Sequence, residues 1–397
     1  NVLGKGVEGN GIFYIKFRNN GSVEWLQTME NPGGNGSGIT VDDEGNLYAW
    51  GYFYEYIRIG GLEYTSEKGY NESDIYLIKF DKDGDLKFVK QFKGTGNIYG
   101  YGGISLTPNN DLLITGSFND TLYLGAYELK SNSISNTWAN DVFIAKVSST
   151  GNIIWARSYC GEYNDEGRSI ASDSLGNIYF TGYFERSISF DSIILEMDEG
   201  YYYDYFLVKM DPTGNLEWVK RGGPKNYQVQ ASSLAVSGDA VYIQGRVYLS
   251  PPDYANAYFG DKLLTSEFRA NSFIASYATT GEINWAKLIK VNNYSNSVYK
   301  IDTDIKGNLY AGGIFSDSIV VGSNLVVGSG GSDYYIVKYD SQGDLDWLKT
   351  SESNNNNSGN INLYSIAVFE EDIVLVGGTF WNGTFNLGNE VVSTASG

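Results

Sequence analysis

The sequence contains no histidine and a single cysteine, Cys160. The absence of histidine excludes His-based acid–base catalysis, Ser-His-Asp triads and His-ligated metals. One cysteine allows neither an internal disulfide nor a thiolate metal cluster, and Cys160 is interpreted as a bystander in its "SYCGEYND" loop. Most of the common catalytic and metal-binding constellations are therefore excluded.

Basic residues are also scarce, with 28 Lys and Arg against 47 Asp and Glu, a formal net charge of −19. Phosphate binding needs clustered Lys and Arg, so the charge argues against a nucleic-acid partner, and an anionic membrane surface is disfavoured. No apolar run approaches the roughly 20 residues of a membrane span, so no membrane insertion is expected. Proline is rare (6 residues), whereas Gly (49) and Tyr (33) are abundant, which predicts many short strands and tight turns.

One phrase occurs six times along the chain, a Lys with a Gly five residues later and an aromatic residue four after that. Its copies are Lys16–Gly21–Trp25, Lys79–Gly84–Phe88, Lys146–Gly151–Trp155, Lys209–Gly214–Trp218, Ser276–Gly281–Trp285 (with Ser in place of Lys) and Lys338–Gly343–Trp347. A second phrase alternates with it, in which a Gly precedes a large apolar residue by two positions: Gly51/Phe53, Gly116/Phe118, Gly182/Phe184, Gly245/Val247, Gly313/Phe315 and Gly378/Phe380. The aromatic position recurs every 62 to 67 residues, which is the mark of a repeat architecture.

Each phrase predicts a β-hairpin. In "YFLVKMDPTGNLEWVK" two apolar strands flank a turn in which Asp211 accepts backbone hydrogen bonds and Gly214 supplies a positive φ. Two hairpins make a four-stranded antiparallel sheet of roughly 60 residues, which is too small to be stable alone. Six such sheets in a ring bury each other, so the predicted fold is all-β, a six-bladed β-propeller forming a single domain over 1–397. The shared aromatic residue is interpreted as a wedge between neighbouring sheets.

The blades are predicted at about 37–92, 102–159, 168–222, 232–289 and 299–350, with a sixth, composite blade in which 364–397 are completed by 11–29. The composite blade is expected because the last repeat stops after its first hairpin and the chain begins with the missing second one. The segment Asn1–Gly11 resembles the stretch before this hairpin in other repeats, so seven blades is the alternative.

These phrases resemble the bacterial secreted or surface β-propeller repeat proteins of the SBBP type, whose pattern reads xDxxGNxYxxGxF followed by DxFxxKxDxxGxxxW. "DSLGNIYFTGYF" with "DYFLVKMDPTGNLEW" is similar to this pattern, and so is "DIKGNLYAGGIF" with "DYYIVKYDSQGDLDW". The resemblance covers essentially the whole chain but departs at Ser276, at Val247 and at "FEEDI", which lacks the turn Gly. It implies an extracellular or bacterial cell-surface location, and a start at Asn1 rather than Met agrees with a removed signal peptide. Fold does not fix function, so activity is not implied.

Strand order predicts two kinds of connection on two faces. The first-to-second and third-to-fourth turns are short and alike, whereas the others are long, varied and rich in Tyr and Asn, with inserts such as "LYLGAYEL" expected to form an extra hairpin. Variable loops on a rigid scaffold are the usual place for binding, and Tyr gives contact area at low entropy cost. Any one Tyr can instead cover a blade edge, but the face as a whole favours binding. The predicted ligand-binding residues are Tyr99, Tyr101, Trp138, Tyr163, Tyr201, Tyr202, Tyr203, Tyr227, Tyr254, Tyr294 and Trp381.

The predicted function is a non-catalytic extracellular binding or adhesion scaffold whose partner is a glycan or a surface protein. One alternative is a polysaccharide hydrolase or lyase, which needs two carboxylates within roughly 5–10 Å of each other. The other is a structural module of a larger cell-surface or filament assembly. No catalytic residue and no cofactor is assigned. The turn "DKDGDL" offers a calcium candidate in Asp81, Asp83 and Asp85, but Phe92 stands where an EF-type loop has its bidentate Glu.

Overall fold

The structure is a computed structural model that describes residues 11–66, 72–100, 102–132, 139–197, 203–223, 228–248, 257–266, 270–291, 297–328, 332–351, 360–369, 373–381, 384–387 and 390–393. These residues form strands and turns without a helix. They divide into two compact units, each of which is described by itself. Unit 1 comprises Asn1–Ile178, Ser187–Ile194 and Asp211–Asn215, and unit 2 comprises Tyr179–Arg186, Leu195–Met210 and Leu216–Gly397. In the part of the chain that is described, no helix has the length and apolar character to cross a membrane.

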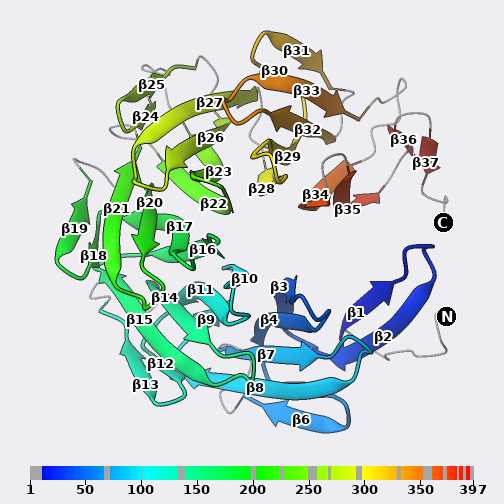
Figure 1. Cartoon of the computed structure of the whole chain (residues 1–397), viewed down its shortest axis with the longest axis vertical. Helices are drawn as coiled ribbons and strands as arrows, with labels where there is room; N and C mark the ends of the chain where they lie inside the picture. The colour runs from blue at the N-terminus through cyan, green and yellow to red at the C-terminus, as the bar shows by residue number, and fades with distance from the viewer. Residues whose placement is uncertain are drawn as a thin grey trace. The chain divides into compact units, whose positions relative to one another are not determined.

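Unit 1 is built from antiparallel hairpins (Figure 1). Its first hairpin joins β1 (Gly11–Phe17) and β2 (Val23–Glu30). A sheet of order β3-β4-β7-β8 follows, made of β3 (Asn35–Val41), β4 (Leu47–Phe53), β7 (Asp74–Phe80) and β8 (Leu86–Gly94). The next sheet, β10-β11-β14-β15, consists of β10 (Ile104–Leu106), β11 (Leu112–Phe118), β14 (Asp141–Val147) and β15 (Ile153–Gly161), and β16 (Glu166–Ser172) comes after it.

The inserts between second and third strands form the predicted extra hairpins. In unit 1 these are β5 (Tyr56–Ile59) with β6 (Leu62–Thr65), β12 (Thr121–Leu124) with β13 (Tyr127–Lys130), and β18 (Ser187–Phe190) with β19 (Ile193–Glu196). Each hairpin joins the sheet of the preceding repeat: β5 pairs with β2, β12 with β8 and β18 with β15. The sheets that contain β8 and β15 therefore have more than the expected four strands, because these two strands extend two residues beyond their own hairpins and offer these residues as a pairing edge.

Unit 2 contains the same kinds of element (Figure 1). The strands β17 (Ile178–Glu185), β20 (Tyr203–Met210) and β21 (Leu216–Gly222) are neighbours in one sheet. A six-stranded sheet has the order β22 (Gln228–Ser237), β23 (Ala240–Tyr248), β26 (Ala270–Ala278), β27 (Ile283–Val291), β30 (Ser318–Val321) and β31 (Asn324–Val327). A four-stranded sheet has β28 (Ser297–Thr303), β29 (Leu309–Phe315), β32 (Asp333–Tyr339) and β33 (Leu345–Thr350). Two-stranded sheets are formed by β24 (Ala257–Phe259) with β25 (Lys262–Leu264), β34 (Asn360–Phe369) with β35 (Ile373–Trp381), and β36 (Thr384–Leu387) with β37 (Glu390–Ser393).

The aromatic residue of the first phrase lies against the turn glycine of the next repeat, which confirms its role as a wedge. A Cβ added to Gly84 would come within 2.7 Å of Trp25 Cγ, and one added to Gly281 within 3.2 Å of the Trp218 ring. The Trp218 indole Nε1 donates to the carbonyl oxygen of Thr279 at 3.1 Å. The same ring-on-glycine contact joins Phe88 to Gly151, Trp155 to Gly214 and Trp285 to Gly343.

The turns themselves have the predicted construction. Gly214 has a φ of +89°, and the Asp211 carboxylate accepts the backbone N–H groups of Thr213 and Asn215 at 2.8 and 2.9 Å. A register shift follows in the hairpin between Lys209 and Met210, as expected of a turn with a bulge. Local sequence thus determines the short turns.

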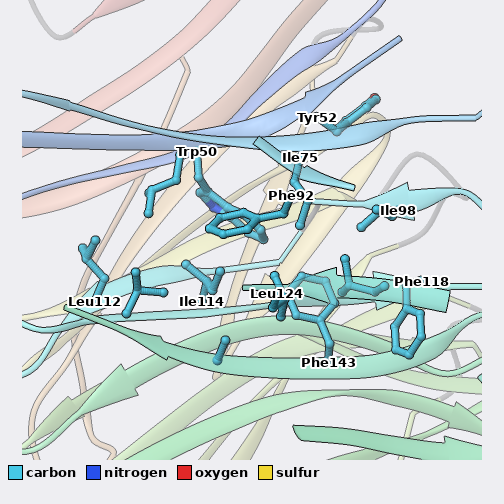
Figure 2. Close-up of a cluster of buried hydrophobic side chains, with 14 of the residues drawn as sticks. Trp50, Tyr52, Ile75, Phe92, Ile98, Leu112, Ile114, Phe118, Leu124 and Phe143 are labelled. Carbon is cyan, nitrogen blue, oxygen red and sulfur yellow. The ribbon is translucent and has the colours of Figure 1, made fainter. Parts of the chain in front are cut away.

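Apolar side chains from successive repeats fill the space between sheets. Figure 2 shows Trp50 and Ile75 from one sheet of unit 1 facing Ile114 and Phe143 from the next. Trp50 and Phe143 meet edge to face, with ring centroids 6.3 Å apart. Such burial holds each small sheet in place and fixes the ends of its strands, from which the long connections start.

Candidate ligand-binding surface

The connection from β8 to β10 contains a two-residue strand, β9 (Ile98–Tyr99), that carries a predicted binding residue. β9 pairs with the end of β11, with Tyr99 opposite Ser117. The Ser73 hydroxyl bonds both backbone groups of Ile98, donating to the carbonyl oxygen at 2.6 Å and accepting the N–H at 3.2 Å. Tyr99 is therefore held on a fixed backbone although it lies in a connection.

Two further tyrosines lie beside Tyr99. Tyr52 is at the end of β4 and Tyr54 follows that strand, and their rings meet edge to face with centroids 5.8 Å apart. The side-chain amide of Asn35, at the start of β3, donates to the Tyr52 hydroxyl at 3.0 Å. Tyr52 and Tyr99 contribute to the raised pKa of Tyr54, and Tyr52 contributes to the raised pKa of Tyr99.

An ion pair adjoins this group. Glu166, at the start of β16, acts electrostatically on the Tyr99 phenol. One of its carboxylate oxygens pairs with Arg168 Nη2 at 2.5 Å, and the other accepts the Asn164 amide at 3.3 Å. We call the set Tyr52, Tyr54, Tyr99, Asn35, Glu166 and Arg168 the tyrosine surface.

A series of hydrogen-bonded asparagine side chains leads to the ion pair. The Asn140 amide donates to Asn164 Oδ1 at 2.9 Å, and Asn119 Oδ1 accepts the backbone N–H of Asn97 at 2.8 Å. Asn119 and Asn140 are themselves linked at 3.5 Å and both are buried. Because Asn119 is buried, its side chain serves this hydrogen-bond chain. The network fixes Asn164, which in turn orients Glu166.

Two phenols of the tyrosine surface, those of Tyr54 and Tyr99, have a raised pKa. Burial raises the pKa of Tyr99, with further contributions from the charge of Glu166 and from Tyr52. Burial also raises the pKa of Tyr54, with contributions from Tyr52 and Tyr99. Both phenols are consequently neutral at physiological pH and available as hydrogen-bond donors as well as acceptors. The surface therefore combines aromatic rings, neutral hydroxyls, an amide and a carboxylate.

This combination suits a polyhydroxylated ligand. Aromatic rings present apolar faces to the C–H groups of a sugar, while hydroxyls, amides and carboxylates exchange hydrogen bonds with its hydroxyl groups. Among the residues described, no group of three or more Cys, Asp or Glu side chains is arranged to hold a metal ion.

The structure locates three of the predicted binding residues. Tyr99 is part of the tyrosine surface, and Tyr163 is half-buried in the same β15–β16 connection as Asn164. Tyr203 starts β20 in unit 2, where its ring meets that of Tyr183 edge to face at 5.0 Å. Seven of the remaining predicted residues lie outside the described part of the chain: Tyr101, Trp138, Tyr201, Tyr202, Tyr227, Tyr254 and Tyr294. For Trp381 the backbone is described but the side chain is not.

Sequence reasoning missed Tyr52, Tyr54, Asn35, Glu166 and Arg168. For Glu166 the repeat itself contains a signal. Eleven residues after the aromatic position of the first phrase come Gly36, Tyr99 and Glu166 in three successive repeats. Equivalent positions of neighbouring repeats lie side by side in stacked sheets, so the acid next to Tyr99 could have been found by aligning the connections.

The turn with the calcium candidates uses its carboxylates internally. Asp81 Oδ1 accepts the backbone N–H groups of Asp83 and Asp85 at 3.1 and 2.9 Å, and its Oδ2 pairs with Lys87 at 2.5 Å. Asp83 pairs with Lys82 at 2.8 Å. These contacts are those of a hydrogen-bonded turn.

The sequence of the chain matches a known repeat family and one curated protein. The family model described as "SBBP: Beta-propeller repeat" matches residues 160–183. An uncharacterised WD repeat-containing protein of Acanthamoeba polyphaga mimivirus is 25% identical over 233 residues, which is 52% of this chain and 17% of that relative's length. The chain thus spans well under two thirds of this relative.

Solved structures to which the chain is similar include a streptogramin B lyase, with a TM-score of 0.38 and 12% identity over 94% of this chain and 93% of the other. An ulvan lyase of a polysaccharide lyase family has a TM-score of 0.40 and 10% identity, over 89% and 90% of the two chains. Nothing about activity follows from likeness at this level. The matched segment contains "DSLGNIYFTGYF", a phrase of the kind that recurs along the sequence, and the match supports a β-propeller repeat of the SBBP type in this chain.

Proposed function

We propose that this protein is a non-catalytic binding scaffold of the adhesion type, secreted or displayed on a bacterial cell surface, that recognises a glycan. The observation that carries the proposal is the folded β8–β10 connection, in which the pairing of β9 with β11 and the two hydrogen bonds between Ser73 and Ile98 hold the half-buried Tyr99 on a fixed backbone. Aromatic rings and paired hydrogen-bonding groups on fixed backbone favour sugar binding over catalysis, for which a carboxylate pair would be required.

A glycan array followed by titration calorimetry tests the proposal. Tyr99→Ala should weaken binding by at least about tenfold, since it removes a ring and a hydroxyl from the centre of the surface. Tyr123→Ala is the matched control, because Tyr123 is an exposed tyrosine on β12, a strand of an insert hairpin in the same unit. Equal losses in both variants, or an array without binding, would refute the proposal. Release of shorter products from a bound polysaccharide would instead favour a hydrolase or lyase.

The proposal includes a closed ring of six blades. Alternate repeats share the phrase Asp-x-x-Gly-Asn-x-Tyr, which begins at Asp42, Asp173 and Asp304, 131 residues apart each time, and the three intervening repeats lack it. The aromatic positions are likewise spaced by 63, 67, 63, 67 and 62 residues. A unit of two repeats present three times supports an even number of blades, and thus six rather than seven.

The sixth blade would be composite, with β35 pairing β1. In four sheets the residue three positions before the Gly of the second phrase is opposite the Lys-position residue, as in Tyr48–Lys79 and Tyr310–Lys338. The same register places Leu375 opposite Lys16. The strand residues that this pairing would cover include exposed apolar ones: Phe13, Phe17, Leu375 and Val376 are 67%, 55%, 60% and 46% exposed.

Disulfide trapping tests the composite blade. In a Cys160→Ser background, Ile15→Cys with Val376→Cys are directly opposite in the proposed register and should form an intramolecular disulfide, because opposed Cα atoms are about 4.5–5.5 Å apart. Ile15→Cys with Leu387→Cys is the control pair and should remain reduced. Disulfide-linked dimers from the first pair would show that the edges meet between chains and would refute closure within one chain.

A further inference from the structure

The outermost strand of one hairpin in unit 2 has an unpaired edge. There β24–β25 and β30–β31 occupy the place that the insert hairpins have in unit 1, between the second and third strands of a repeat. The sheet that contains β31 ends at this strand, so in the described part of the chain no strand pairs with its other side. The edge of β31 therefore presents free backbone N–H and C=O groups.

The hairpin register shows which residues of β31 direct their backbone groups outwards. At the open end of the hairpin the Gly328 N–H donates to the carbonyl oxygen of Asp317 at 2.6 Å, so this pair is hydrogen-bonded. The next pair inwards is Val327 opposite Ser318. Because hydrogen-bonded and non-hydrogen-bonded pairs alternate in an antiparallel ladder, Leu325 and Val327 direct their N–H and C=O groups away from β30.

The same two residues expose apolar side chains. Leu325 and Val327 are 64% and 71% exposed, and they lie on one face of the strand because they are two positions apart. Val326 between them packs against the hydrophobic core of the unit and holds the strand in place. The sequence from Ser318 to Ser332 contains no charged residue. The edge thus combines outward backbone groups with apolar side chains and carries no charge.

The other insert hairpins differ at these positions. The second and fourth residues after the hairpin turn are exposed in each of them: Glu63 and Thr65, Glu128 and Lys130, Ile194 and Glu196, and Leu263 and Thr265. Charged side chains on an edge strand prevent pairing with another edge. Among the insert hairpins whose side chains are described, β30–β31 is the one with an apolar residue at both positions.

A second copy of β31 fits this edge. When two such strands run antiparallel with Val326 opposite Val326, Leu325 of each copy lies opposite Val327 of the other. Both of these residues face the other strand with their backbone groups, so two hydrogen-bonded pairs form, with about four hydrogen bonds in total. The two leucines and two valines lie on one face and cover each other. No like charges are brought together within the paired strands, although each copy carries a net charge of −19.

We infer that β31 is a self-association surface, through which two copies of the chain pair edge to edge about a twofold axis. The inference does not rest on the proposed function, because β31 belongs to unit 2 and the tyrosine surface to unit 1. A contact of this size is at the weak end of protein interfaces, so we expect a dissociation constant of roughly 0.1–1 mM.

Sedimentation equilibrium of the full chain up to about 1 mM tests the inference. The mass should rise towards that of a dimer, and dimerisation should strengthen between about 0.05 and 0.5 M NaCl, because salt screens the repulsion between two acidic copies. Val327→Glu gives β31 the apolar–glutamate pair found in β19 and should weaken dimerisation at least about tenfold. Thr65→Glu is the matched control, because it adds the same charge at the equivalent position of β6. It should leave the dissociation constant within about twofold of its original value.

Disulfide trapping tests the register. In a Cys160→Ser background, a mixture of Leu325→Cys and Val327→Cys chains should form disulfide-linked heterodimers, because opposed Cα atoms in this ladder are about 5.5 Å apart. Either variant alone should give fewer linked dimers, because its two cysteines then lie diagonally, about 7–8 Å apart.

The possible outcomes separate this surface from others. A chain that stays monomeric up to about 1 mM at both salt concentrations would overturn the inference. Equal weakening by Val327→Glu and Thr65→Glu would do the same, and so would dimers that Val327→Glu leaves intact. If the chain stays monomeric but an extended apolar peptide binds at β31, the edge accepts a different strand and the inference is wrong. Circular dichroism shows whether the variants are folded, and the glycan array tests the proposed function separately.

Discussion

The contact between a turn glycine and the aromatic residue of the preceding repeat can be tested by Gly84→Ala. Gly84 has a φ of +87°, so alanine there adopts the left-handed conformation at a cost of roughly 1–2 kcal/mol. The new Cβ would also lie 2.7 Å from Trp25 Cγ and 2.8 Å from Cδ2, closer than van der Waals contact allows. Displacing a packed indole adds roughly 1–3 kcal/mol. The total destabilisation should be roughly 2–5 kcal/mol.

Gly61→Ala separates the two contributions. Gly61 has a φ of +79° in the β5–β6 turn, but an added Cβ would meet nothing within 4 Å. This variant should therefore show the conformational cost alone, roughly 1–2 kcal/mol. Urea unfolding of both variants beside the unmodified protein, followed by tryptophan fluorescence, measures the difference. If Gly84→Ala proved no less stable than Gly61→Ala, the ring-on-glycine contact would not be the element that joins successive repeats.

Three further predictions follow from the same repeats. Trp218→Phe keeps a ring on the glycine but removes the bond from Nε1 to the Thr279 carbonyl, and should lower the free energy of unfolding by about 1 kcal/mol in urea; no change would show that this bond is dispensable. Burial acts to raise the pKa of Asp211, but hydrogen bonds within its turn outweigh it and lower the pKa to about 2. Stability from this carboxylate is thus complete above the unfolded value near 4 and lost as the pH falls from about 4 to 2, so Asp211→Asn should flatten this part of a stability–pH profile, and an unchanged slope would contradict the assignment. Gly21→Ala, at a φ of +79° with nothing within 4 Å, should cost as much as Gly84→Ala if Trp347 covers Gly21 in a closed ring, and only as much as the Gly61 variant if it does not.

The parts of the fold that sequence predicted are those determined by local chemistry. The Asp and Gly of each turn specify a positive φ and a bulge within five residues, and the insert hairpins have a two-residue turn between apolar runs. The aromatic wedge was also predictable, because a large ring at one fixed position in every repeat needs a constant partner. Gly281 under Trp218 is such a partner.

The parts that sequence did not predict depend on pairing between distant segments. The hairpin β12–β13 joins β8, and Leu122 opposite Gly94 bridges 28 positions of chain. The sequence of the insert does not determine which strand edge the hairpin pairs with, because unpaired N–H and C=O groups are the same on every strand. Likewise β9 pairs with β11 through Tyr99 and Ser117 across an intervening strand. A Tyr-rich connection predicted a binding face, but the choice of Tyr99 over its neighbours required the fold.

The position of the tyrosine surface follows from a departure from the repeat. Eleven residues after the aromatic position, six repeats carry Gly36, Tyr99, Glu166, Val229, Asn296 and Ser358. A residue needed only for stacking the sheets would be similar in all six copies, as the turn glycine is. The change from glycine to tyrosine to glutamate over three successive repeats instead places a small residue, a ring and an acid at equivalent positions, and Val229 in the following repeat is fully buried. Binding chemistry in a repeat protein is therefore best sought at positions that the scaffold leaves free to differ, and in this chain that criterion selects the connections around Tyr99 and Glu166.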